Sequence, residues 1–143
     1  IEFTKSRPRH SNDNALVEAK NGAVLRKHLG YSHIPQKHAP KVNEFLHDYL
    51  NPYINFHRPC FFPETYPDKK GKQRKRYRYE RMMTPYDKLR SLPNAEACLK
   101  DGTTFQQLDD MAASISDNEA ARRLNQARNR LFQAISGRAR RVA

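Results

Sequence analysis

The sequence lacks the features that mark several large classes of protein. Its 143 residues contain only two cysteines, Cys60 and Cys98, which are far apart and have no CxxC spacing. We therefore expect neither a disulfide framework nor a zinc site. No apolar run approaches the roughly 18 residues of a membrane-spanning helix, and the first residues do not resemble a secretory signal. We expect no membrane partner and a cytoplasmic location.

Apolar and acidic residues are also scarce. Hydrophobic residues make up 37% of the chain, which is little for a single large core, so small helical clusters are expected. The 15 Asp and Glu residues are outnumbered by 27 Lys and Arg, which gives a formal net charge of +12. This charge favours a polyanionic partner such as a nucleic acid, although charge alone does not separate DNA from RNA.

Two helices are expected in the first part of the chain. Capping side chains around Asp13 and a stop at Gly30 predict a helix over about 13–29. Apolar residues at helical spacing, with Pro40 suited to the first turn, predict a second helix over about 40–56. These two helices belong to the first of three expected parts of the chain, residues 1–59.

The remainder changes character twice. Helical periodicity disappears from Cys60 to about Met83, where an extended arm or loose hairpin is expected over residues 60–83. Thr84 and Pro85 then cap and open a short helix to about Leu92. Two further apolar faces predict a helical hairpin over about 104–136, within a C-terminal helical region of residues 84–143. The expected fold class is mainly α.

Three segments carry a resemblance to a known family. The segment Asn12-Asp13-Asn14-Ala15-Leu16-Val17-Glu18-Ala19-Lys20-Asn21 resembles the last acidic motif of the integrase-like transposases of bacterial insertion sequences. Two later segments resemble the same family in the same order: Tyr53-Ile54-Asn55-Phe56-His57-Arg58-Pro59 and Thr84-Pro85-Tyr86. The resemblance extends over roughly residues 3 to 95. It implies that the first two helices close a ribonuclease-H-like catalytic core.

The resemblance also implies a site and an activity. Glu18 would be the catalytic third acid of a site that binds Mg²⁺ or Mn²⁺, together with two aspartates that we expect in a preceding part of the intact enzyme. That enzyme would cut DNA at element ends and join it to target DNA, acting as a self-associating, nucleoid-associated protein. We expect this chain alone to bind DNA without cleaving it and to hold no metal tightly.

Helical geometry suggests which neighbours assist Glu18. At about 100° per residue, Asn14, Glu18 and Asn21 form one polar stripe. Arg26 lies further along the same helix, where its guanidinium can reach a DNA phosphate, and Lys27 follows it. Asn14, Asn21, Arg26 and Lys27 are therefore predicted DNA contacts.

The expected arm is the second candidate site. It concentrates eight basic residues against one acidic residue, Glu80, in a short stretch: Lys69, Lys70, Lys72, Arg74, Lys75, Arg76, Arg78 and Arg81. If this stretch is extended, Arg76 and Arg78 face one way, whereas Tyr77 and Tyr79 face the other. The basic face is predicted to contact phosphates, and the tyrosines either anchor the arm or stack on unpaired bases. A solvated charge run remains the simpler interpretation.

Two other classes of function stay open. One is a stand-alone basic α-helical adaptor that binds nucleic acid and has no catalytic ancestry. The other is an assembly module that associates through residues 104–136, where Leu124 and Leu131 would line the interface.

Overall fold

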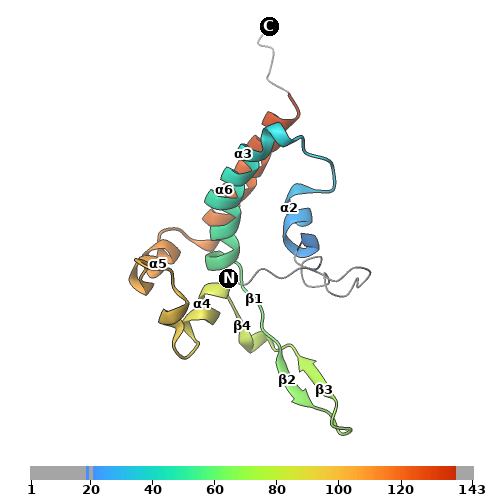
Figure 1. Cartoon of the computed structure of the whole chain (residues 1–143), viewed down its shortest axis with the longest axis vertical. Helices are drawn as coiled ribbons and strands as arrows, with labels where there is room; N and C mark the ends of the chain where they lie inside the picture. Colours follow the sequence, from blue (N-terminus) through green and yellow to red (C-terminus); the bar gives the residue numbers. More distant parts are fainter. Residues whose placement is uncertain (1–18, 20, 138–143) are drawn as a thin grey trace. The chain divides into compact units, whose positions relative to one another are not determined.

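The computed structural model describes Ala19 and residues 21–137, and this part of the chain is mainly helical (Figure 1). It divides into two compact units, Ile1–Ala39 and Pro40–Ala143. Among the described residues, no helix is long and apolar enough to cross a membrane.

The first unit contains the end of the first expected helix. A π-helix, η2 (Asn21–Arg26), continues into α2 (Lys27–Leu29), and the short 3-10 helix η3 (Gln36–His38) follows. Gly30 stops the helix with a φ of 76°, a conformation that glycine adopts without steric cost, and its N–H donates to the Arg26 carbonyl at 2.9 Å. The predicted end of the helix is therefore confirmed, whereas its predicted start at about residue 13 lies outside the described residues.

A continuous helix over residues 39–57, here called the 39–57 helix, starts at the last residue of the first unit and belongs to the second unit from Pro40 onward. It consists of α3 (Ala39–Phe45), the π-helix η4 (Leu46–Leu50) and the π-helix η5 (Tyr53–His57). Residues 51–52, between the two π-helices, are α-helical. Pro52 lies inside it with helical dihedral angles, φ −58° and ψ −46°. The helix predicted over about 40–56 is confirmed.

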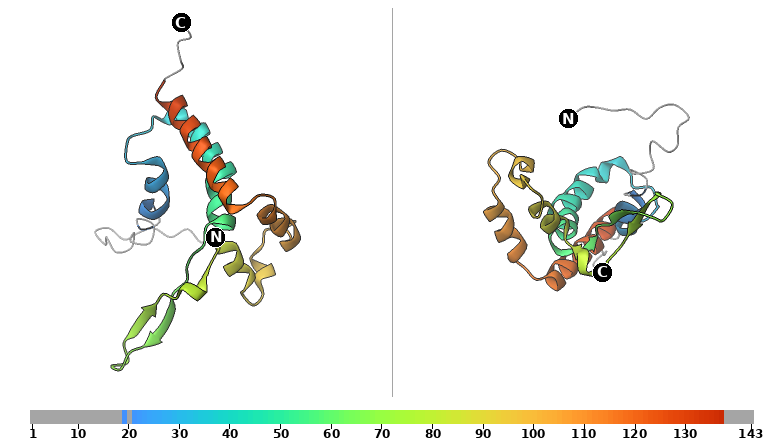
Figure 2. Two further views of the ribbon diagram at one scale, coloured as in Figure 1. Left: turned by 180° about the vertical axis from the view of Figure 1, so that it is seen from behind. Right: turned by 90° about the horizontal axis from the view of Figure 1, so that it is seen from below.

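Residues 60–83 form an antiparallel hairpin in two ladders, here called the basic hairpin. At its base, β1 (Cys60–Phe61) pairs with β4 (Met82–Met83). Beyond that, β2 (Glu64–Pro67) pairs with β3 (Gln73–Arg76), and the 3-10 helix η6 (Tyr79–Arg81) lies between β3 and β4. In Figures 1 and 2 the β2–β3 ladder extends away from the helices of its unit.

A short helix, α4 (Pro85–Arg90), follows the hairpin and begins as predicted. The Thr84 hydroxyl accepts the Asp87 N–H, and the Asp87 carboxylate accepts the Thr84 N–H, so both ends of a capping box are present. The 3-10 helix η7 (Ala95–Cys98) comes next in the chain. The Tyr86 hydroxyl of α4 donates to Asp109 Oδ1 at 2.6 Å, which connects α4 to the helix that follows η7.

The last two helices are α5 (Phe105–Ala113) and α6 (Asp117–Ile135), and Thr104 and Ser116 cap their first turns. They do not form the expected helical hairpin, because α6 packs along the 39–57 helix and α5 turns away from it (Figures 1 and 2). The physical reason is the distribution of apolar surface. The buried face of α6 consists of four residues at helical spacing, Ala120, Leu124, Ala127 and Leu131, whereas α5 has no buried residue.

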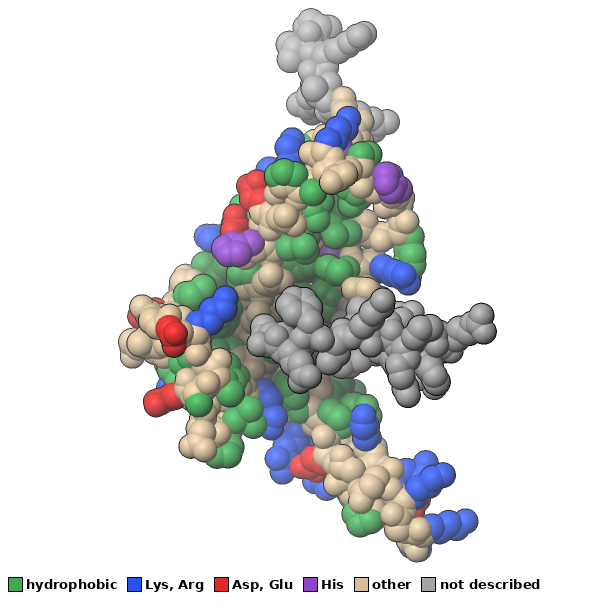
Figure 3. All heavy atoms as spheres, in the orientation of Figure 1, with side chains coloured by type: hydrophobic (Ala, Val, Ile, Leu, Met, Phe, Trp, Pro, Cys, Tyr) green, Lys and Arg blue, Asp and Glu red, His purple; other side chains and the backbone are tan. Residues whose placement is uncertain are grey.

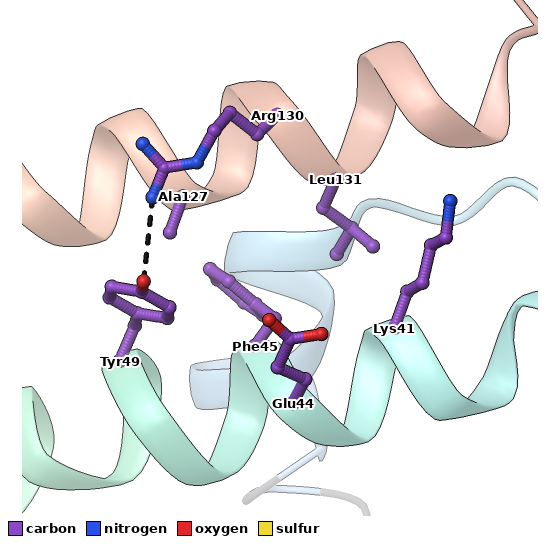
Figure 4. A pocket seen from close by; sticks show the side chains of 7 residues that line it. All are labelled: Lys41, Glu44, Phe45, Tyr49, Ala127, Arg130 and Leu131. Atoms are coloured by element: carbon purple, nitrogen blue, oxygen red, sulfur yellow. Dashed lines mark hydrogen bonds between the residues drawn. The ribbon is translucent and has the colours of Figure 1, made fainter.

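Contacts between α6 and the 39–57 helix form the core of the second unit. Phe45 and Leu50 are 3% and 0% exposed, and Phe45 lies beside Ala127 and Leu131 (Figure 4). At the start of α6, Nδ1 of the buried His57 lies 3.0 Å from Asp117 Oδ1. The structure thus groups the residues differently from the expected parts 1–59, 60–83 and 84–143, since the 39–57 helix belongs with α6.

Candidate nucleic-acid interface

A five-residue turn closes the basic hairpin. The Asp68 N–H donates to the Lys72 carbonyl, and the Gly71 N–H donates to the Asp68 carbonyl, both at 2.9 Å. Gly71 has a φ of 74°, as a hairpin turn followed by a glycine bulge requires. The Asp68 carboxylate reinforces the turn by accepting the N–H groups of Lys70 and Lys72, each at 2.9 Å.

These bonds also fix the charge of Asp68. The backbone N–H groups of Lys72 and Lys70, with a smaller contribution from the Arg74 side chain, lower the pKa of the Asp68 carboxyl below its usual value. Asp68 therefore stays ionised near neutral pH while its oxygens are occupied by donors of the turn. The turn holds two lysines at its tip without presenting a free carboxylate beside them.

The lysines of the hairpin have no acidic partner in the part of the chain that the structure describes. Within residues 21–137, no carboxylate pairs with the ammonium groups of Lys69, Lys70, Lys72 or Lys75. All four residues are exposed, as is every residue from Gly71 to Met82. Figure 3 shows Lys and Arg side chains gathered at the free end of the hairpin. These ammonium groups are available to phosphates without first breaking an ion pair.

The hairpin arginines are held differently. Arg74 Nε lies 3.2 Å from Asp68 Oδ2. Arg78 Nε and Arg81 Nη2 lie 3.5 Å and 2.9 Å from the two carboxylate oxygens of Glu64. These arginine side chains are 49% to 61% exposed, and surface pairs of this kind contribute little to stability. The pairs therefore orient the guanidinium groups. Because each pair is weak, a phosphate can replace the carboxylate at a small cost in free energy.

Strand register assigns the side chains to two faces. Glu64 is opposite Arg76 and Tyr66 is opposite Arg74, so these four residues share one face. Lys75 is opposite Thr65 on the other face. Neither face is covered by a core, because every residue of β3 and all but the first of β2 are exposed.

The tyrosines beyond β3 contact the base of the hairpin. Tyr77 and Tyr79 lie edge-on to Phe61, with ring centroids 6.1 Å and 5.3 Å apart and interplanar angles of 87° and 71°. The strand ends at Arg76, so the expected alternation does not continue as a regular strand through Tyr79. The contacts with Phe61 support the anchoring interpretation, although the two tyrosines remain 58% and 79% exposed.

The candidates in the first unit are only partly described. Asn14 and Glu18 lie outside the described residues. Asn21 is half-buried at the start of η2, whereas Arg26 and Lys27 are exposed, and the Arg26 guanidinium lies 5.3 Å from the centre of the Tyr31 ring. Because η2 is a π-helix, the expected angle of about 100° per residue does not apply across residues 21–26.

Sequence reasoning missed three residues of the hairpin site. Glu64 and Asp68 orient arginines, and the Tyr66 ring supports Arg76, whose guanidinium carbon lies 5.0 Å from the ring centre. The turn signal from Asp68 to Gly71 was visible in the sequence, but a register counted outward from those four residues would have placed Glu64 opposite Lys75, one residue away from its observed partner Arg76. Among the described residues, no group of three or more His, Cys, Asp and Glu side chains could hold a metal ion.

Comparisons with known proteins give limited guidance. No family model matches the chain, and no solved structure matches it. It is 38% identical over 61 residues to the uncharacterized protein y4rM of Sinorhizobium fredii (strain NBRC 101917 / NGR234). That match covers 43% of this chain but only 17% of the relative's length, and the relative's name states no activity.

Proposed function

We propose that this chain is the DNA-binding C-terminal part of an integrase-like transposase, in which the basic hairpin holds DNA through its phosphates. The observation that carries the DNA-binding proposal is a set of four exposed lysines that have no acidic partner among the described residues: Lys69, Lys70, Lys72 and Lys75. A rigid turn presents three of them, and the β2–β3 ladder keeps the fourth on an uncovered face.

Binding of this kind follows from the physics of the DNA backbone. Each phosphate that a cation neutralises releases condensed counterions, so the logarithm of the binding constant falls with the logarithm of salt concentration by about 0.9 per contact. About six contacts would lower the affinity on the order of 10³-fold between 50 and 200 mM salt. The hairpin offers eight cationic side chains between Lys69 and Arg81 for such contacts.

The transposase part of the proposal depends on the resemblance of three segments. In the intact enzyme Glu18, with two aspartates, would hold Mg²⁺ or Mn²⁺, and the metal would stabilise charge on the attacking and leaving oxygens. Glu18 lies outside the described residues. DNA binding by the hairpin does not involve the metal. The gene provides the test. An in-frame upstream region with two such aspartates, within flanking inverted repeats, supports the transposase, and its absence favours the stand-alone adaptor.

Fluorescence anisotropy on duplex DNA across a salt series tests the hairpin. We expect replacement of Lys69, Lys70, Lys72 and Lys75 by Gln to reduce the salt slope by roughly 3 to 4, since four phosphate contacts are lost. The matched control removes the same charge outside the hairpin, by replacing Lys37, Lys41, Lys88 and Lys100 with Gln. The control should keep a slope near that of the unchanged protein. Equal losses in both variants would mean that net charge alone drives binding, and the hairpin would not be the site.

A further inference from the structure

Arg76 differs from the other arginines of the basic hairpin. Arg74, Arg78 and Arg81 each pair with a carboxylate, whereas no carboxylate in the described part of the chain pairs with Arg76. Its guanidinium lies over the ring of Tyr66, with the guanidinium carbon 5.0 Å from the ring centre. Within the described residues the Arg76 guanidinium donates no hydrogen bond, so its N–H donors remain for another acceptor.

Tyr66 acts as a support for this side chain. A cation–π contact restricts the rotamers of a long arginine side chain. The ring is 39% exposed, so the pair lies at the surface of the hairpin. Arg76 is therefore held in place without losing its hydrogen-bonding capacity.

The β2–β3 ladder has the dimensions of a groove-binding element. Its strands lie about 4.8 Å apart, and the major groove of duplex DNA, which is about 12 Å wide, admits a two-stranded ribbon. Both faces of the ladder are free of packed neighbours, as insertion into a groove requires. Inside the major groove, an arginine donates two hydrogen bonds to O6 and N7 of guanine, the commonest base-specific contact.

We propose that the β2–β3 ladder enters the major groove of duplex DNA and that Arg76, supported by Tyr66, binds the O6 and N7 edge of a guanine. The proposal rests on the DNA-binding function proposed above and adds a base-reading residue to it. Lysines of the turn contact phosphates and position the hairpin, and Arg76 supplies a preference for guanine. Lys75, on the opposite face, has no part in this contact.

Guanine analogues give a direct test with the full chain. The probes are a guanine-containing duplex and the same duplex with every guanine replaced by 7-deazaguanine, which lacks the N7 acceptor. We expect the unchanged protein to bind the analogue duplex more weakly, on the order of 10-fold, because one hydrogen bond from a charged donor is lost. R76A removes every donor that could reach this edge of the guanine, so it should bind both duplexes equally.

Matched variants separate this role from a general one. R78A makes the same chemical change in the same hairpin and should keep the preference for guanine. Y66A should reduce the preference, and Y66F, which keeps the ring, should restore it. These comparisons read a ratio between two duplexes, so a uniform change in affinity or folding does not imitate the expected result.

Other outcomes overturn the proposal in recognisable ways. Salt-dependent binding with equal affinity for both duplexes would end the base-reading role but leave phosphate binding by the hairpin in place. An R76A variant that still binds the guanine duplex more tightly than the analogue duplex would also end the base-reading role. Tighter binding to single-stranded DNA than to duplex would overturn groove entry and point instead to base stacking on Tyr77 and Tyr79. Absence of any duplex binding would remove the DNA-binding function itself.

Discussion

Individual carboxylates organise the local structure of this basic chain. Asp68 closes the turn of the basic hairpin, Glu64 holds two arginines, and Asp109 accepts hydrogen bonds from Tyr86 and Arg90. Burial, reinforced by the Asp109 hydrogen bond, raises the pKa of Tyr86, while the bonds from Tyr86 and Arg90 lower the pKa of Asp109. Each of these three carboxylates serves as an acceptor for more than one donor.

Glu119 gives a prediction at this scale. Its carboxylate accepts hydrogen bonds from Arg122 at 2.8 Å and 3.0 Å and from Arg123 at 2.7 Å, which lowers the pKa of Glu119 from 4.5 to about 2. Because the pKa is lower in the folded state, the ionised form stabilises the fold. That contribution is complete above pH 4.5 and is lost as the pH falls toward 2.

Carboxyl NMR titration measures this pKa directly. We expect a midpoint near 2 for Glu119 in the unchanged protein and a return toward 4.5 when Arg122 and Arg123 are both replaced by Gln. In E119Q, the loss of stability between pH 4.5 and 2 should be smaller than in the unchanged protein. A midpoint near 4.5 with both arginines present would show that the ion pairs do not form in solution.

At the scale of elements, periodicity and capping residues located most of the helices. The stop at Gly30, the cap at Thr84 and the apolar rhythm of residues 40–56 are local signals, and each predicted a boundary or an element that the structure contains. The partner of α6 was not predictable in this way. An apolar stripe shows which face is buried but not which helix covers it, so α5 was expected where the 39–57 helix lies.

Part of the candidate site was also predictable from local sequence signals. The run of basic residues was visible in the sequence, and so was the loss of helical periodicity over residues 60–83. Which of these cations pair with carboxylates was not predictable. The pair of Arg74 with Asp68 depends on the register of the ladder, and the pairs of Arg78 and Arg81 with Glu64 depend on how the chain continues beyond β3. Registers follow from turn geometry, and a shift of one residue would have moved every side chain to the other face.

Leu124 tests the packing of α6. It is 4% exposed and belongs to the face that packs on the 39–57 helix, so L124A should lower the free energy of unfolding by about 2 to 4 kcal/mol. The neighbouring exposed Asn125 is the control, and N125A should change the free energy of unfolding by less than about 0.5 kcal/mol. Chemical denaturation followed by circular dichroism measures both.

The same packing bears on the idea of assembly through residues 104–136. Leu124 and Leu131, the residues expected to line such an interface, are buried within the chain. If L124A proved as stable as N125A, the leucine would not be packed as described, and an intermolecular role would become the better interpretation.

At the scale of the molecule, charge is distributed unevenly. Residues 69–81 carry eight basic side chains and one acidic side chain, which is more than half of the chain's excess of +12. This stretch belongs to the element with the least buried surface in its unit, since every residue from Gly71 to Met82 is exposed. The helices that bury the core therefore do not depend on the hairpin.

Limited digestion with trypsin tests this independence. Among residues 21–137, we expect the earliest cuts between Lys69 and Arg81, because local opening there breaks few buried contacts. Mass spectrometry identifies the cut sites, and circular dichroism should show that helical content is retained after them. First cleavage within α6 at Arg122 or Arg130 would contradict the expectation, since these bonds are part of a packed helix.

The β2–β3 ladder contains only two strands, so each strand has an edge whose N–H and C=O groups lack a neighbouring strand. Such edges promote aggregation, because a strand from another molecule can add to them, and charged side chains, lysine above all, discourage this addition. Mutual repulsion between basic hairpins would keep separate molecules apart in solution. A polyanion that neutralises them would remove the repulsion, so high protein concentrations with sub-saturating DNA should favour hairpin-to-hairpin pairing.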